Sequence, residues 1–390
     1  MSFMKARQVV QTCVLSTRWR HLWRSVPCLD VDDQEFKTSG VNTASAEKEM
    51  EKFEDFTDHL LIPNNISIAH LDTFRLHVFD RYHLGKQAAK WIRHGIKYRA
   101  QVPGILQDGL TSTSWRLKRL HLSNVQLDEC FAKHVSSGCH YLEDMELNGC
   151  SCRFHEIISH SLKNLVLKSC SFIGCSEIKS STLKNLVIDD CTTVASNNLI
   201  ITVPAVAYLF LSLSSYYFGG GDWFNEMPSL VKAHVHLWDN HGESVSEDQA
   251  KLLGSLSNVT SLELLGFQTM MFSEESMAFP NFRNLKSLLL DSCDLSDNFK
   301  ILEHFLKHSH LEKLTLRCCK FSKDLKRRKG KAKSKAASSS QGVNLVDAEC
   351  KNLKLTEIIY KDDDVRLLVE LLLSISEHVP KNNIKLTKAD

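Results

Sequence analysis

A short apolar pattern recurs along most of this 390-residue chain. Apolar residues stand at offsets 0, 3 and 5 of nine segments, which begin at residues 117, 142, 162, 183, 206, 230, 259, 285 and 311. Consecutive segments begin 20 to 29 residues apart, and a period of this length is typical of repeat arrays. A chain of this length otherwise forms two or three globular domains, so the period favours one elongated array.

The offsets within each segment indicate a strand. In "LKNLVLKSC" (162 to 170), Leu165 and Leu167 point to one side, while Val166 and Lys168 point to the other. A single strand cannot bury both leucines alone, so neighbouring strands must stack to form a core. Each repeat is therefore expected to supply one short parallel strand.

These segments resemble leucine-rich repeats, which commonly place Asn or Cys at the turn that follows the strand. Cysteine stands there, at offset 8, in five copies: Cys150, Cys170, Cys191, Cys293 and Cys319. The resemblance implies an α/β leucine-rich-repeat solenoid, with a curved parallel sheet and with helices and loops on its convex side. Most of these thiols are therefore expected to be structural.

Further elements are expected at both ends of the array. An earlier strand is expected within 71–79, followed by a helix with Ala88, Trp91, Ile92 and Ile96 on one face. A last strand is expected within 353–361 and a capping helix within 362–380. A flexible insertion is expected at about 323–342, where the sequence is polar and basic.

The stretch "VVQTCVLSTRWRHLWRSVP" (9 to 27) has two readings. It forms a small helical cap on the array if Ser16 begins a second short helix whose buried stripe is Trp19, Leu22 and Trp23. The alternative comes from a resemblance: "VLSTRWRHLWRSVPCLDVDD" (14 to 33) is similar to the second half of the F-box of plant F-box proteins. The matching positions are Leu15, Ser16, Arg18, Trp19, Arg20, Leu22, Trp23, Pro27, Leu29 and Asp32.

The resemblance implies four domains. They are a partial F-box at 1–35, a linker and helix at 36–70, the repeat array at 71–352, and a C-terminal strand and helix at 353–390 similar to the FBD segment of these plant proteins. The helix of the second region is marked by Met50, Phe53, Phe56 and Leu60. The Leu-Pro pair and apolar helix that open an F-box are not in this sequence.

The resemblance also implies a function without catalysis. The chain is expected to be the substrate-recognition subunit of an SCF-type cullin-RING E3 ubiquitin ligase, with a small adaptor and an unknown target protein as partners. The alternative is a leucine-rich-repeat scaffold that has lost adaptor binding because its F-box is incomplete. Adaptor contacts are assigned to Val10, Val14, Leu15, Arg18, Trp19, Leu22 and Trp23.

The outward side chains of the strands are expected to bind the target, because they line the concave face of a solenoid. Phe210, Leu265 and Leu289 are expected to be exposed apolar anchors on this face, or else to be partly covered by neighbouring loops. The remaining assigned residues are His121, Glu146, Lys168, Asp189, His234, His236, Glu263, Asp291 and Arg317.

The sequence gives little support for a metal or cofactor site. The histidines of "HEIISH" (155 to 160) are five apart and would diverge on a helix, and no paired C-x-x-C motif is present, so no metal or other cofactor is expected.

The charge of the chain bears on nucleic-acid binding. The formal charge is +2, and residues 326–335 carry seven Lys or Arg, so the remainder carries 2 − 7 = −5. That balance argues against nucleic acid as the partner of the folded part.

The location of the protein is inferred from what the sequence contains. Residues 1–8 lack the apolar core of a secretory signal, and no stretch of about 18 apolar residues indicates a membrane span. A cytoplasmic or nuclear protein is expected. The basic run is either a nuclear import signal at Lys326, Arg327, Arg328 and Lys329, a phosphate-contacting arm, or a solvated loop.

Overall fold

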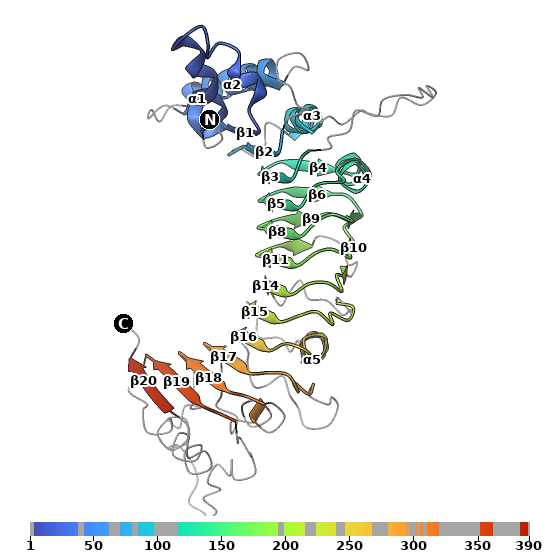
Figure 1. Cartoon of the computed structure of the whole chain (residues 1–390), viewed down its shortest axis with the longest axis vertical. Helices are drawn as coiled ribbons and strands as arrows, with labels where there is room; N and C mark the ends of the chain where they lie inside the picture. Colours follow the sequence, from blue (N-terminus) through green and yellow to red (C-terminus); the bar gives the residue numbers. More distant parts are fainter. Residues whose placement is uncertain are drawn as a thin grey trace, which may run out of the picture. The chain divides into compact units, whose positions relative to one another are not determined.

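The computed structural model describes residues 4–37, 43–61, 71–79, 85–96, 116–193, 199–214, 224–238, 246–266, 280–293, 295, 302, 305–306, 310–319, 352–361 and 383–388. The chain divides into two compact units, residues 1–206 and 207–390. Each unit contains a row of parallel strands with one strand from each repeat (Figure 1). The predicted leucine-rich-repeat solenoid is confirmed.

The row of the first unit has six strands. In spatial order they are β1 (Cys28–Asp32), β2 (Thr73–His77), β3 (Arg119–Ser123), β5 (Asp144–Asn148), β8 (Asn164–Lys168) and β11 (Asn185–Asp189). Every pairing in this row is parallel and keeps equal offsets opposite one another, as Leu165 lies opposite Met145 and Leu186. The offset pattern therefore sets the register as well as the buried face.

The row of the second unit has seven strands. They are β14 (Tyr208–Ser214), β15 (Lys232–Trp238), β16 (Ser261–Leu265), β17 (Ser287–Asp291), β18 (Lys313–Arg317), β19 (Leu355–Tyr360) and β20 (Asn383–Lys388). All of them pair in parallel. β19 confirms the strand expected within 353–361, whereas β20 was not anticipated.

The core lies directly beneath these rows. In all nine segments the residues at offsets 0, 3 and 5 are buried, and so are Leu71, Phe74 and Leu76 of the tenth copy around β2. Val26, Leu29 and Val31 follow the same offsets and are also buried, so β1 is an eleventh copy. The first strand was expected at 71–79, so β1 was not anticipated.

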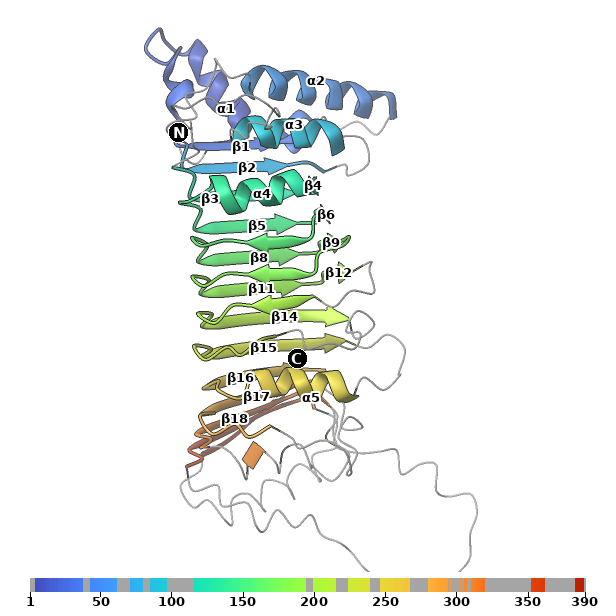
Figure 2. The ribbon, with the colours of Figure 1, turned by 90° about the vertical axis from the view of Figure 1, so that its right-hand side faces the viewer.

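Among the described residues, the other side of the repeats carries the helices α3 (Gly85–Gly95), α4 (Glu129–Gly138) and α5 (Ser246–Ser255), as Figure 2 shows. Each of these helices stands in a repeat of 25 or more residues. In the repeats that begin at 142, 162 and 183, which are only 20 to 23 residues long, short strands replace helices, because the connection is too short for several helical turns. These strands are β6 (Ser151–Arg153), β9 (Ser171–Phe172) and β12 (Thr192–Thr193), which form one sheet with β4 (Gln126–Asp128) of the preceding repeat, and β7 (Glu156–Ile158), β10 (Glu177–Lys179) and β13 (Ile200–Thr202), which form another.

The N-terminal region differs from the predicted helical cap with a second helix at Ser16. It contains α1 (Ala6–Gln11), the 3-10 helices η1 (Thr12–Val14), η2 (Leu22–Ser25) and η3 (Asp33–Phe36), and α2 (Thr43–Leu61). α2 confirms the helix expected around Phe53 and Leu60, both of which are buried. Ser16, however, begins no α-helix, because residues 17–21 form turns and residues 22–25 form the 3-10 helix η2.

Several expected elements lie outside the described residues. These are the capping helix within 362–380, the basic insertion at about 323–342, and the four proposed import residues. The proposed domain limits remain a prediction.

Two features recur where the chain leaves each strand, one at offset 7 and one at offset 8. At offset 7 the backbone is left-handed in seven copies, with φ between 47° and 72°, at Asn124, Gly149, Ser169, Asp190, Gly266, Ser292 and Cys318. At offset 8 the thiol of each of the five cysteines donates to the carbonyl oxygen of the offset-5 residue one repeat back, at 3.3 to 3.5 Å, as Cys150 does to Leu122. Burial raises the pKa of the Cys319 thiol, which keeps it a neutral donor. The prediction that these thiols are structural is confirmed.

Two glycine substitutions should have effects of opposite sign. Gly149→Ala is expected to lower the free energy of unfolding by about 1–2 kcal/mol, because φ is 62° at this turn. Gly254→Ala in α5 is expected to raise it by about 0.5–1 kcal/mol, because the position is helical and an added Cβ meets nothing within 4 Å. Urea unfolding followed by circular dichroism measures both; equal signs would contradict this account of the turn.

Candidate functional site

The outward face of the first unit carries charged side chains that pair across neighbouring strands. Arg75 Nη1 lies 3.6 Å from Asp30 Oδ2, and His121 Nδ1 lies 3.1 Å from Glu146 Oε2. Lys168 Nζ approaches the other oxygen of Glu146 at 3.6 Å. Burial lowers the pKa of His121, although Glu146 opposes this shift. The structure thus brings together three of the four target-face residues assigned in this unit, while Asp189 lies one strand further on.

The outward face of the second unit is more aromatic. Glu263 on β16 lies 2.7 Å from Lys232 Nζ and 2.8 Å from His234 Nδ1. Burial alone would raise the pKa of Glu263, but the two bonds from Lys232 and His234 lower it overall. The ring of His234 also stacks on Phe210, with centroids 4.5 Å apart and planes 10° apart. Phe210, His234 and Glu263 therefore form a continuous cross-strand group.

The remaining predicted residues of this face lie beside that group. Asp291 Oδ2 is 3.5 Å from Arg317 Nη1, and in register His236 lies opposite Leu265, which lies opposite Asp291. Phe210, Leu265 and Leu289 are all half-buried, which favours the alternative of partial cover over full exposure. The ring of His234 covers part of Phe210.

An apolar patch lies at the N-terminal region. The side chains of Val14, Leu15, Leu22 and Trp19 are 86%, 69%, 50% and 38% exposed. Arg18 is exposed, and Val10 and Trp23 are half-buried. We call these seven residues the N-terminal patch. The alternative that Trp19, Leu22 and Trp23 form a buried stripe is therefore wrong; Ala6, Val9 and Val26 are the residues that bury there. Clustered exposed apolar side chains of this kind mark interaction surfaces.

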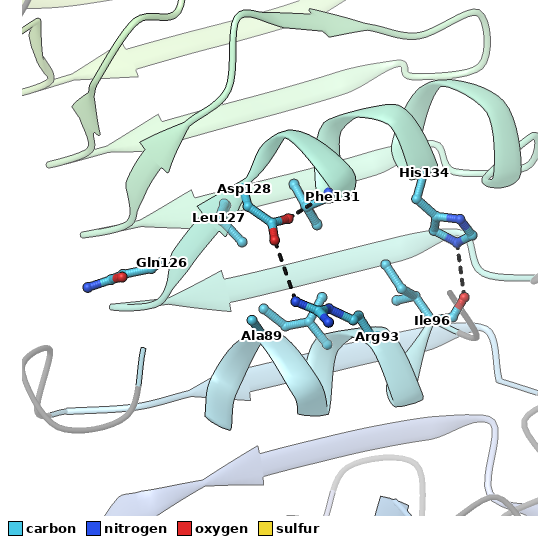
Figure 3. Close-up of a pocket in the computed structure, with 9 residues that line it drawn as sticks. Ala89, Arg93, Ile96, Gln126, Leu127, Asp128, Phe131 and His134 are labelled. Atoms are coloured by element: carbon cyan, nitrogen blue, oxygen red, sulfur yellow. Dashed lines mark hydrogen bonds and ion pairs between the residues drawn. The ribbon is translucent and has the colours of Figure 1, made fainter. Parts of the chain in front are cut away.

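A small cavity between α3 and α4 is too small to bind a ligand. Its volume is about 10 Å³, room for one water molecule at most. Asp128 at its rim accepts from the Phe131 N–H at 2.9 Å and lies 3.5 Å from Arg93 Nη2, and His134 Nε2 lies 3.1 Å from the Ile96 carbonyl oxygen (Figure 3). These bonds join the two helices, so the cavity is a packing defect.

His134 should make stability depend on pH. Burial lowers its pKa below the ordinary 6.5, so the unfolded chain takes up this proton at higher pH than the folded one. The contribution of His134 to the free energy of unfolding is therefore full above pH 6.5 and is lost as the pH falls below it. In His134→Gln, urea midpoints measured from pH 7.5 to 5 should fall less than in the parent chain. An unchanged slope would contradict this assignment.

One polar residue was missed by the sequence analysis. Asp33 is only 3% exposed, and its Oδ2 accepts from the Phe79 N–H at 2.7 Å. Its Oδ1 is buried and has no hydrogen-bond partner among the described residues. Burial raises the pKa of this carboxyl. No sequence signal identifies it, because its neighbours in space come from positions up to 46 residues away.

Comparison with known proteins gives curated relatives from plants. The MEIOTIC F-BOX protein MOF of Oryza sativa is 28% identical over 389 residues, which cover 92% of this chain and 77% of that protein. A putative FBD-associated F-box protein of Arabidopsis thaliana is 25% identical over 345 residues, covering 74% of this chain and 76% of that protein. A putative F-box/FBD/LRR-repeat protein of the same plant is 34% identical over 103 residues, covering 25% of this chain and 20% of that protein.

The predicted resemblance is therefore confirmed: the chain is a homologue of plant F-box, F-box/leucine-rich-repeat and FBD-associated F-box proteins. No family model matches the chain, and no solved structure matches it. Within the residues that the structure describes, no helix has the length and apolar character needed to cross a membrane.

Proposed function

We propose that this chain is the substrate-recognition subunit of an SCF-type cullin-RING ubiquitin ligase. The observation that carries the proposal is the N-terminal patch, where Val14, Leu15, Trp19 and Leu22 keep large apolar side chains in solvent. These are residues that the F-box resemblance assigns to the adaptor. A soluble chain that leaves them exposed is expected to cover them with a partner.

The proposal divides two tasks between two surfaces. The N-terminal patch binds the small ligase adaptor, and the outward strand faces bind the target protein. The mixed character of those faces suits a protein partner, since ion pairs such as Glu263 with Lys232 stand beside the half-buried rings of Phe210 and His234. In this role the chain is a non-catalytic receptor that acts in the cytoplasm, the nucleus or both.

Co-purification tests the adaptor half of this proposal. The chain is mixed with the purified adaptor, alone and with the Leu-Pro helix of a complete F-box fused ahead of it. Retention of the adaptor by either form supports the receptor function. If neither form retains it, the chain is instead a repeat-based scaffold outside the ligase.

Proximity labelling in plant cells tests the target half. The parent chain is compared with a variant carrying Phe210→Ala, Leu265→Ala and Leu289→Ala, and with a control carrying Tyr141→Ala, an exposed aromatic outside these faces. The triple variant should lose a set of labelled proteins that the control keeps. An unchanged set would show that the strand face is not the contact surface.

A further inference from the structure

An acidic groove in the first unit belongs to neither of the surfaces above. It lies between η3, α2 and the residues that follow β2, and its volume is about 610 Å³. Among the described residues, five carboxyl groups and one ammonium group line it: Asp33, Glu47, Glu49, Glu51, Glu54 and Lys37. The balance of charge among these lining residues is therefore negative.

Two features of the groove show that its negative charge is not fully compensated. The first is Asp33, whose buried Oδ1 has no partner among the described residues. A buried carboxylate oxygen without a donor is costly, and nearby positive charge reduces that cost. Lys37 lies close enough to act on this carboxyl, but burial still raises the pKa of Asp33.

The second feature is repulsion along α2. Burial raises the pKa of Glu54, and the carboxylates of Asp58, Asp55 and Glu51 raise it further. Glu47, Glu51 and Glu54 form no ion pair with another described residue. A cation held in the groove would relieve this repulsion.

The apolar wall of the groove suits a long cationic side chain. Phe79 is 60% exposed, and Lys37 Nζ lies 3.4 Å from the centroid of its ring. This contact demonstrates that the ring accepts an ammonium group on its face. Met50 adds apolar surface, against which the methylene stem of a lysine or arginine packs while its charged head stays near the carboxylates.

We propose that this groove binds a segment of a partner protein that is rich in lysine and arginine. One cationic side chain lies against Phe79 and Met50, and its head faces the carboxylates of α2 and Asp33. The proposal does not depend on the ligase function, since none of these residues belongs to the N-terminal patch or to the outward target-face residues.

A metal ion is a less suitable occupant. Asp32, Asp33 and His77 offer ligand atoms within 4.8 Å of one another. Both oxygens of Asp32, however, already have partners, because Oδ1 accepts from the Gln34 N–H at 3.0 Å and Oδ2 lies 3.0 Å from Lys5 Nζ. A metal would have to displace these groups, whereas a peptide cation in the groove displaces none of them.

Fluorescence polarisation with a labelled ten-residue Lys/Arg peptide tests the proposal on the full chain. A peptide with glutamine at every basic position serves as the probe control. The double variant Glu47→Lys, Glu51→Lys reverses two exposed charges of the groove without touching the core. Its peptide Kd is expected to rise by about 10-fold or more, and that of Phe79→Ala by several-fold.

A matched variant separates a site from a general charge effect. Glu156→Lys with Glu177→Lys makes the same change of charge on neighbouring strands β7 and β10 of the same unit. It should change the Kd by less than about twofold. Three results would overturn the proposal: no effect of the groove variants, an equal effect of the matched variant, or competition of the peptide by zinc that is reversed by EDTA. Circular dichroism verifies that each variant is folded.

Discussion

Truncation of Leu165 to alanine is expected to lower the free energy of unfolding by about 2–5 kcal/mol. The side chain is 1% exposed, and on the two neighbouring strands it lies opposite the buried residues Met145 and Leu186. Strands on both sides hold β8 in place through ladder hydrogen bonds, so the surroundings cannot collapse into the space left by the lost atoms. The cost should therefore include a cavity as well as the lost burial.

A neighbour on the same strand provides the control. Val166 faces outward and is half-buried, so Val166→Ala should cost less than about 1 kcal/mol. Urea unfolding of the parent chain and both variants, followed by circular dichroism, measures the difference. Similar losses for Leu165→Ala and Val166→Ala would mean that the two faces of the strand do not differ as the burial pattern indicates.

The strands could be predicted because their signal is local. Offsets 3 and 5 face the core whatever the rest of the repeat does, so nine short segments were enough to predict the parallel strands and their buried face. β1 was missed although Val26, Leu29 and Val31 carry the same offsets. The next copy begins 45 residues later, at Leu71, and this gap hides the period. β20 was missed because none of its residues is buried.

The surfaces were less predictable, and for different reasons. An apolar stripe has the same spacing whether it is buried or left exposed for a partner, so Trp19 and Leu22 could not be assigned from the sequence alone. On the strand face, the outward offsets were correct, but the stacking of His234 on Phe210 depends on side-chain placement. The acidic groove joins Asp33, residues 47–54 and Phe79, which no sequence period connects.

Replacement of Trp19 and Leu22 by alanine together is expected to weaken binding of the ligase adaptor by about 100-fold or more, if the proposed function holds. Large apolar side chains at the centre of an interface commonly contribute about 2 kcal/mol or more each when truncated. In the free chain these two side chains are 38% and 50% exposed, so their loss should change the free energy of unfolding much less than it changes binding. The two effects can therefore be measured separately.

Two control variants make the result specific to the patch. Tyr141→Ala removes an aromatic side chain that is 59% exposed elsewhere in the same unit, and it should leave adaptor binding unchanged. Trp91→Ala removes a fully buried ring that packs on Phe53 with centroids 5.3 Å apart, and it should destabilise the fold by about 3–5 kcal/mol. Adaptor affinity is measured by calorimetry with the form of the chain that retains the adaptor. If Trp19→Ala with Leu22→Ala binds as tightly as Tyr141→Ala, the adaptor does not contact the N-terminal patch, because exposed side chains of this size cannot leave an interface without a measurable loss.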